Sequence, residues 1–545
     1  MPQLVASNDS APETTISKPD PKGVAPGSKE IVIGLVGYAG AGCSTVGKNL
    51  LRELRKQGYN AMPTVKLSAL ISERSGVELP NIPEGADEGS AKLERARVLQ
   101  NLGDELRRQH GGHAVASLAV KKIMELRAGK QPGEEKIAFV LDSIKHDEEV
   151  ELLRRVYDKS FRLVAVHCER SEREFRLFGK KNQQAKYAGA DEESVKAYLD
   201  RDEKDADNKH GQQVRDAFFL ADYFLDNNQK SENAARITDD LERLVSLLLG
   251  TDLVRPTVQE TGMFYAHAAA LRSSCLSRQV GAALQTKDGT IVSTGTNEVP
   301  TYGGGVYVDG AEHDHRCFAW EWDYEEQKFK GCHNARLKNK LREDIAKWMA
   351  NNFAEKLAEV AMPKKAGSLD IQAGLRAKAA DGIKKFFESE SEKFERMPGV
   401  KDLIEYARSI HAEMNALFNA AAQGISPKGC ILYTTTFPCH NCARHLITAG
   451  IDVVYYIEPF VKSLAKQLHY DSITTDWGDV GSNKMRILPF TGVGPRMYED
   501  HFMKRAELKN GRTGVYEKPA GEIPSVAVRL RELGHVEAAA AKLID

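Results

Sequence analysis

The sequence has little that would tie it to a membrane, a nucleic acid or an oxidising compartment. No apolar run approaches the ~20 residues needed to cross a bilayer, and the N-terminus lacks the pattern of a secretory signal. The formal net charge is −1 and aromatic residues make up 7% of the chain, which argues against a stable nucleic-acid partner. Eight cysteines in 545 residues argue against a disulfide framework. We therefore expect a cytoplasmic protein without membrane contact.

The chain is too long for one compact core, since domains usually contain roughly 100–200 residues. Ser, Pro, Thr, Gly and Lys dominate residues 1–28, so we expect a disordered leader there. Apolar, β-branched runs such as IVIGLVG at 31–37 then alternate with helical stretches. This alternation predicts a parallel α/β domain over 29–250.

A second domain is predicted over 255–520, followed by a C-terminal tail at 521–545. Its first two strands flank a Lys-Asp-Gly turn at 287–289, which is typical of a β-hairpin. The stretch 303–400 is rich in charge and alanine, and we interpret it as a helical insertion. Helices and the strands CILYTTT and VVYYI alternate after it.

The sharpest motif joins an HAE tripeptide that begins at His411 to a PCHNC segment that contains Cys439 and Cys442. This order of residues is the signature of zinc-dependent deaminases. One imidazole and two thiolates leave the fourth tetrahedral position open for water, as in catalytic zinc sites. Both clusters fall at predicted helix N-termini, where the helix dipole favours the thiolate. Glu413 is then the candidate catalytic acid and base. Taken alone, a CxxC pair more often indicates structural zinc or redox chemistry.

With these motifs, residues 255–500 resemble the deoxycytidylate deaminase family of the cytidine deaminase fold. The resemblance extends to the segment RQVGA at 278–282, the turn TGTNEVP at 294–300 and the strand VVYY. It implies a three-layer α/β/α domain, a zinc cofactor, free deoxycytidine nucleotides as substrates, and a homo-oligomer.

The same resemblance implies two substrate contacts. Asn297 would bind the sugar or base, and Tyr455 or Tyr456 would pack against the nucleotide. The alternative for Asn297 is a turn residue that satisfies its own backbone.

A glycine-rich loop follows the first strand of the N-terminal domain and precedes a helix. Strand, glycine loop and helix N-terminus together form a phosphate cradle, with hydroxyls available to Mg²⁺. The candidate nucleotide-binding residues are Gly37, Gly40, Gly42, Ser44 and Thr45.

The lysine of a complete phosphate-binding loop is missing, because Cys43 stands in its place. Lys48 is turned about 140° away on the predicted helix. Three arginines spaced three residues apart offer replacement charge, or else form a solvated helix face; they are Arg170, Arg173 and Arg176. Asp142 is either a metal-binding carboxylate or a polar strand end. The loop is therefore expected to bind a nucleotide through its backbone groups. Efficient phosphoryl transfer is not expected, because the charge that stabilises the transferred phosphate is missing.

Residues 29–250 resemble P-loop nucleotide kinases apart from this lysine. A P-loop domain ahead of a deoxycytidylate deaminase resembles the antiphage dCTP deaminases of bacteria. That resemblance implies deamination of dCTP and dCMP, depletion of the cytosine deoxynucleotide pool, and regulation by the N-terminal domain.

The insertion offers a possible second metal site. Its HDHRC and GCH segments contain Cys317, Cys332 and His333, together with His313 and His315, and such residues can hold structural zinc. The alternative is that the cysteines act as small hydrophobic residues and the histidines are solvated.

Two other functions use parts of the same sequence. A deaminase that edits DNA or RNA needs a basic groove and stacking aromatics, which the neutral charge and low aromatic content disfavour. An NTP-dependent kinase or switch, with a regulatory deaminase half, is disfavoured by the missing lysine.

Overall fold

The computed structural model describes most of the chain. The described residues are 29–82, 88–127, 129–130, 135–178, 187, 189–205, 208–228, 233–250, 252–324, 327–361, 369–389, 406–459, 463–503, 509–517 and 530–545. The predicted leader lies outside them. Within these ranges, no helix has the length and apolar character needed to cross a membrane.

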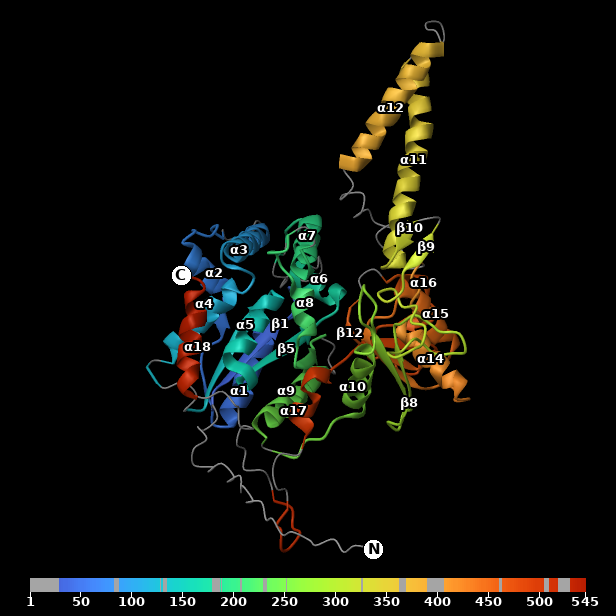
Figure 1. Ribbon diagram of the computed structural model, residues 1–545. Helices are drawn as coiled ribbons and strands as arrows, with labels where there is room; N and C mark the ends of the chain where they lie inside the picture. Colours follow the sequence, from blue (N-terminus) through green and yellow to red (C-terminus); the bar gives the residue numbers. More distant parts are fainter. Residues whose placement is uncertain are drawn as a thin grey trace, which may run out of the picture. The chain divides into compact units, whose positions relative to one another are not determined.

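The chain divides into two compact units. The first comprises 1–221, 227–254 and 504–545, and the second comprises 222–226 and 255–503. Both are built from β-sheets covered by helices (Figure 1), so the predicted α/β class is confirmed.

The first unit contains a parallel sheet. Its strand β1 (Ile31–Val36) is buried along its whole length. It pairs in parallel with β4 (Ile137–Ile144) on one side and β5 (Phe161–His167) on the other. The short strands β2 (Asn60–Ala61) and β3 (Val65–Lys66) also pair in parallel with β4. Strands buried on both faces are expected to be continuously apolar, as β1 is; β4 is apolar up to Leu141 and then carries Asp142 and Ser143.

Helices surround this sheet. They are α1 (Cys43–Lys56), α2 (Leu67–Ser75), α3 (Glu88–His110), α4 (Ala114–Leu126), α5 (Asp147–Tyr157), α6 (Arg170–Phe178), α7 (Glu192–Glu203), α8 (Val214–Phe219), α9 (Asn233–Leu249) and α18 (Leu530–Lys542), with a 3₁₀ turn at Asp158–Ser160. The glycine loop connects β1 to α1. Because parallel strands end at the same edge of a sheet, this loop lies at the edge where β4 also ends.

The helix α18 lies within the stretch predicted as a C-terminal tail, 521–545, and belongs to the first unit. It packs against α4 and α5, and Figure 1 shows it beside α4. Glu537 of α18 is fully buried and accepts hydrogen bonds from Arg127. Arg127 also donates to the buried carboxylate of Glu30. The packing of α18 was hard to predict, because a short alanine-rich segment with few large apolar residues gives little sign that it is buried.

The second unit is built on a mixed sheet with strand order β13-β14-β12-β11-β7-β8. The predicted hairpin is formed by β7 and β8, and β11 pairs with β7 in the antiparallel sense. The remaining pairs of this sheet, β11 with β12, β12 with β14 and β14 with β13, are parallel. The bounds are Gly281–Gln285 for β7, Ile291–Thr296 for β8, Ile431–Thr436 for β11, Val453–Glu458 for β12, Ile473–Thr474 for β13 and Met485–Pro489 for β14.

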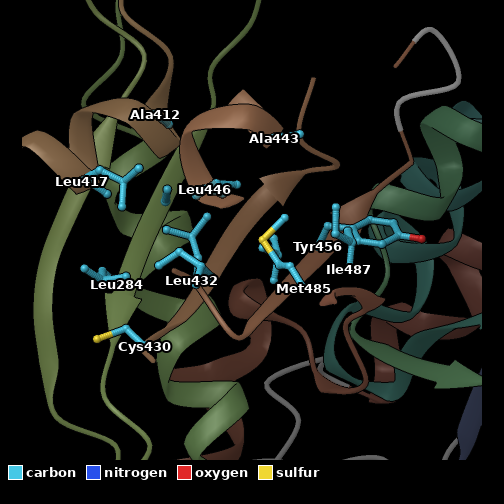
Figure 2. Close-up of a cluster of buried hydrophobic side chains, with 14 of the residues drawn as sticks. Leu284, Ala412, Leu417, Cys430, Leu432, Ala443, Leu446, Tyr456, Met485 and Ile487 are labelled. Carbon is cyan, nitrogen blue, oxygen red and sulfur yellow. The ribbon is translucent and has the colours of Figure 1, made fainter. Parts of the chain in front are cut away.

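Helices cover both faces of this sheet. α10 (Val258–Ala270) lies on the face to which Gly281 points. α14 (Ala412–Ala422) and α15 (His440–Thr448) lie on the other face, where Ala282 joins their shared core (Figure 2). Three layers result, as the family resemblance implied. The remaining elements are α16 (Ala465–Leu468), a 3₁₀ turn at Pro495–Met497, α17 (Tyr498–Phe502), and the antiparallel pair of β6 (Tyr223–Asp226) and β15 (Gly492–Val493).

The predicted insertion, 303–400, contains a hairpin of β9 (Trp322–Tyr324) and β10 (Gln327–Phe329). The long helices α11 (His333–Ala361) and α12 (Leu369–Ser389) follow and pack along each other (Figure 1). The prediction of a helical insertion extended to residue 400, and 390–405 lies outside the described residues.

Candidate functional site

The N-terminus of α14 carries His411 and Glu413. His411 is the N-cap residue, with an extended backbone (φ −76°, ψ 151°). The first turn of α14 lies directly on β8 because Gly295 has no side chain: a Cβ there would be 2.1 Å from a backbone carbonyl oxygen of α14. Thr296 N–H also donates to Asn415 Oδ1 at 3.0 Å. Strand β8 therefore fixes the position of both functional side chains.

The N-terminus of α15 carries the two cysteines. Cys439 is its N-cap residue, and its Sγ accepts a hydrogen bond from the N–H of Cys442 at 3.4 Å. A sulfur here takes the place of the usual capping oxygen. Ser463 Oγ holds the preceding turn by donating to Pro438 O at 2.7 Å. The CxxC spacing thus places both thiols at one helix end.

The three predicted ligands converge. The ligand atoms of His411, Cys439 and Cys442 lie within 4.8 Å of one another, and no other group of three or more such ligands occurs in the described ranges. His411 Nδ1 is 3.4 Å from Cys439 Sγ and 3.3 Å from Cys442 Sγ. A tetrahedral zinc ion would separate such nitrogen and sulfur atoms by about 3.6 Å. The residues present therefore fit a zinc ion with an open fourth position.

Glu413 lies beside this centre and outside the ligand group. Its side chain is buried, and Cys442 Sγ donates to its Oε2 at 3.3 Å. Burial raises the pKa of Glu413. Hydrogen bonds from Cys442 and from His411 lower the pKa of Cys439 to about 4, so Cys439 is a thiolate at neutral pH. The centre thus combines a ready metal ligand with an acid that can hold a proton.

A cavity of about 300 Å³ opens onto the centre, within the size range of small-ligand pockets. Its wall includes the loop that follows α10 after Ala270. This loop is held by Ser273 Oγ, which donates to Asn297 O at 2.7 Å, and by Ser274 N–H, which donates to Glu298 at 2.7 Å. His411, Glu413 and Cys439 line the cavity.

Asn297 lines the same cavity, as predicted for a substrate contact. Its Oδ1 accepts from Val280 N–H at 2.6 Å, and its Nδ2 donates to Arg278 O at 2.7 Å. An amide can make further bonds beyond these two. In the structure, the Asn297 side chain holds the 278–280 segment through these two hydrogen bonds. Its contact with substrate stays a prediction.

The structure does not bring Tyr455 to this cavity. Tyr455 stacks on Tyr433, which packs on the α10 face of the sheet. Alternation along β12 places Tyr456 on the opposite face, in the core under α14 and α15. Tyr456 contacts Phe437 edge-on at 5.0 Å, and Phe437 lines the cavity. The aromatic residue that reaches the cavity is thus Phe437, which the sequence reasoning missed.

Two arginines that the sequence reasoning also missed line the cavity. Arg278 forms an ion pair with Glu458 at 2.6 Å. Arg408 donates to His315 O at 2.7 Å and lies 4.3 Å from the ring centroid of Trp322. Arg278 begins the RQVGA segment quoted for the family resemblance, and Arg408 lies three residues before His411, so charge within and beside those motifs was the available signal.

The candidate second metal ligands do not converge into a site like the first. Cys317, Cys332 and His333 all line the cavity, but they do not form a metal-ligand group within the described residues. The Nδ1 of His333 contacts Tyr324 Oη at 3.0 Å. His315 packs between aromatic rings, with Trp320 at 4.1 Å.

Comparison with known proteins bears directly on this centre. Residues 256–458 match the family described as the cytidine and deoxycytidylate deaminase zinc-binding region. This part of the chain is therefore similar to a deaminase zinc-binding region. The match spans both ligand helices, β7, β8 and the insertion.

Curated relatives match shorter stretches. ComE operon protein 2 of Bacillus subtilis is 41% identical over 66 residues, which cover 11% of this chain and 35% of that protein. The probable deoxycytidylate deaminase of Drosophila melanogaster is 48% identical over 48 residues, which cover 9% and 23%. The chain therefore spans about a third or less of the length of these relatives.

Among solved structures, a shikimate kinase from Bacteroides thetaiotaomicron is 18% identical. The likeness covers 40% of this chain and 98% of that chain, with a TM-score of 0.24. At this level it carries no argument about what the first unit binds.

The glycine loop of the first unit borders a cavity of its own, of about 500 Å³. Of the predicted nucleotide-binding residues, Gly37, Gly40, Gly42 and Ser44 line it, whereas Thr45 does not. Gly40 and Gly42 have positive φ angles of 86° and 90°, which favour glycine. Burial raises the pKa of Cys43 to about 12, so no charge replaces the missing lysine at that position.

Other side chains bring charge to the loop. Lys145, just after β4, lies with its Nζ 3.3 Å from Gly37 O and 2.8 Å from Asp202. Of the three predicted arginines, Arg176 donates to Gly40 O at 3.3 Å. Lys145 was missed, although neighbouring parallel strands bring the residues after β1 and β4 together.

The rest of the predicted set lies around the loop. Ser44 Oγ donates to Asp142 Oδ2 at 2.5 Å. Arg173 lies at the loop, donating to Ala39 O at 3.5 Å, and is also bonded to Glu203. Arg170 is bonded to Glu174 and Asp200.

Zinc content tests the assignment of the ligands. We expect elemental analysis to find one zinc ion per wild-type chain, and close to none in Cys442→Ser, because two remaining ligands hold zinc poorly. Cys332→Ala is the matched control, since Cys332 lines the same cavity but lies outside the ligand group. A fall in zinc content in the control, or none in Cys442→Ser, contradicts the assignment.

Proposed function

We propose that the zinc-binding region is a hydrolytic deaminase of free deoxycytidine nucleotides, which converts dCMP, dCTP or both to the uracil nucleotide and ammonia. The observation that carries the proposal is the convergence of His411, Cys439 and Cys442 beside Glu413 at the cavity. The name of the Drosophila relative, a probable deoxycytidylate deaminase, supports the same substrate class.

In the proposed mechanism, His411, Cys439 and Cys442 would hold zinc, which when bound supplies a Lewis acid that lowers the pKa of a water ligand. Glu413 would take the proton of that water at its carboxylate. The same carboxyl group would then deliver protons to N3 of the ring and to the departing amino group. Its burial suits this role, because a raised pKa brings a carboxyl group closer to working pH.

The substrate would enter the cavity with its base toward Glu413. Phe437 offers an apolar surface, and Asn297 fixes the 278–280 wall. We propose that Arg278 and Arg408 attract the phosphates, because they are cations on the wall of a small cavity. A cavity of about 300 Å³ suits a single nucleotide better than a polynucleotide strand.

We further propose that the first unit regulates this activity by binding a nucleotide at its glycine loop, together with Mg²⁺. Ser44 and Asp142 would hold the ion. The resemblance of the sequence to antiphage dCTP deaminases supports the wider proposal of a cytoplasmic homo-oligomer that depletes the cytosine deoxynucleotide pool during phage infection.

Product analysis tests the proposed substrate class. The zinc-loaded protein is incubated separately with dCMP, dCTP and a cytosine-containing single-stranded oligonucleotide. We expect uracil product from at least one free nucleotide and none from the oligonucleotide, since a cavity of about 300 Å³ suits a single nucleotide better than a strand. Uracil formed only in the oligonucleotide would overturn the proposal and favour a polynucleotide editor. Phosphoryl transfer that survives Glu413→Ala would instead show a separate kinase activity.

A further inference from the structure

The cavity of the first unit contains polar groups that phosphate binding at the glycine loop does not use. The loop forms one part of its wall, and α3 forms another through Gln100 and Arg107. All of its lining residues belong to the first unit.

Gln100 is the most informative of these residues. Its side chain is 7% exposed and lines the cavity. Neither its amide oxygen nor its amide nitrogen has a hydrogen-bond partner within the described part of the chain. An unsatisfied buried polar group destabilises the fold, so two of them on one side chain indicate a binding partner that enters the cavity.

Arg107 presents a third group on the same face of α3, two turns further along. Its Nε and Nη2 donate to Glu149 at 3.0 and 2.8 Å. Its Nη1 has no hydrogen-bond partner among the described residues, although Asp104 Oδ1 lies 3.6 Å away.

A chain of hydrogen bonds joins this face of α3 to the glycine loop. Glu149 binds Arg107 through one oxygen and accepts from the backbone N–H of Lys145 through the other, at 3.0 Å. The Nζ of Lys145 in turn lies 3.3 Å from Gly37 O. The two parts of the cavity wall are therefore held in a fixed relation, as a site for one extended ligand requires.

We propose that this cavity binds one nucleoside triphosphate, with its phosphates at the glycine loop and its base against Gln100 and Arg107. A carboxamide carries a donor and an acceptor side by side and matches the edge of a nucleobase, which offers the complementary pair. Arg107 Nη1 would donate to a base carbonyl oxygen or ring nitrogen. The cavity volume of about 500 Å³ is within the range for ligands of this size.

This inference specifies the ligand that would regulate the second unit. Only the regulatory role of that ligand rests on the function proposed above. Because the Gln100 substitutions described below alter only the first unit, their effect on binding does not depend on whether the second unit deaminates anything.

Binding to the full-length protein tests the inference. Dissociation constants are measured by calorimetry for dTTP, dATP, dGTP and dCTP, and for inorganic tripolyphosphate, all with Mg²⁺. The protein carries Glu413→Gln so that dCTP is not consumed. We expect at least one nucleoside triphosphate to bind more tightly than tripolyphosphate. Gln100→Met, which keeps the length of the side chain, should weaken that nucleotide at least about tenfold, the equivalent of one buried hydrogen-bonding group.

The matched control is Gln109→Met on the same helix, where the side chain is exposed and bonded to Glu105. It should leave every dissociation constant unchanged, and Gln100→Met should leave tripolyphosphate binding unchanged. Gln100→Asn, which shortens the amide, provides a second variant if the methionine variant does not fold. Equal nucleotide binding by wild type and both Gln100 variants would overturn the inference, as would the absence of any nucleoside triphosphate binding or an equal loss of tripolyphosphate binding.

Discussion

Glu413→Gln is expected to retain zinc and to lose about 10²–10⁴-fold in turnover, the usual contribution of a general acid and base. The variant keeps the size of the side chain, so the ligand geometry around Cys442 should persist. It removes the group that would carry protons between water, ring nitrogen and ammonia. Turnover is measured by product analysis with saturating nucleotide, and zinc content by elemental analysis of the same preparation.

Glu298→Gln is the control for this prediction. Glu298 is a buried carboxylate on the same cavity wall, but it accepts hydrogen bonds from backbone N–H groups of Ser274 and Val299. Its replacement should lower turnover by less than about tenfold, because it disturbs a wall hydrogen bond and no proton transfer. Comparable losses in both variants would indicate that Glu413 acts only through the structure of the cavity.

Arg127→Met is expected to destabilise the first unit by about 3–5 kcal/mol, the range for breaking a buried ion pair. The arginine binds two carboxylates, Glu30 and Glu537, and all three side chains are almost fully buried. Methionine keeps much of the volume but leaves the two carboxylates facing each other without a cation. The loss is measured by hydrogen exchange of peptides from α4 and α18 in the full-length protein.

Lys121→Met is the matched control for this prediction. Lys121 joins the same helix α4 to Asp545 at 3.0 Å, but both side chains are about half exposed. Exposed ion pairs contribute about 1 kcal/mol or less. Faster exchange in α18 of Arg127→Met but not of Lys121→Met is therefore the expected pattern. Similar exchange in the two variants would mean that apolar packing, and not the buried arginine, holds α18.

The zinc-binding region was predictable because its chemistry is local in sequence. His411 and Glu413 occupy one helix start, and Cys439 and Cys442 another, so spacing alone placed each pair correctly. The convergence of the two pairs followed from the strand between them. The family match over 256–458 supports the prediction of a deaminase zinc-binding region there, while the role of each residue stays a prediction.

The sequence alone could not predict the residues that only tertiary contacts bring to a cavity. Lys145 and Gln100 reach the glycine-loop cavity from segments far away in sequence, and neither belongs to a motif. Tyr455 and Tyr456 show the opposite difficulty. The sequence allowed either residue to approach the nucleotide, and only the alternation of β12 across the sheet separates them. Phe437 was not predicted as a cavity residue, because it lies between the two zinc motifs and belongs to neither.

The packing of α18 has a consequence for the order in which the chain is made. Glu30 and Arg127 are synthesised early, whereas Glu537 leaves the ribosome only after the whole second unit. Domains generally fold as they emerge, so the zinc-binding region can complete its core while the buried arginine of the first unit still lacks its second carboxylate. A chain cut between residues 503 and 530 would accordingly retain the metal centre, and its first unit would lose the helix that completes it.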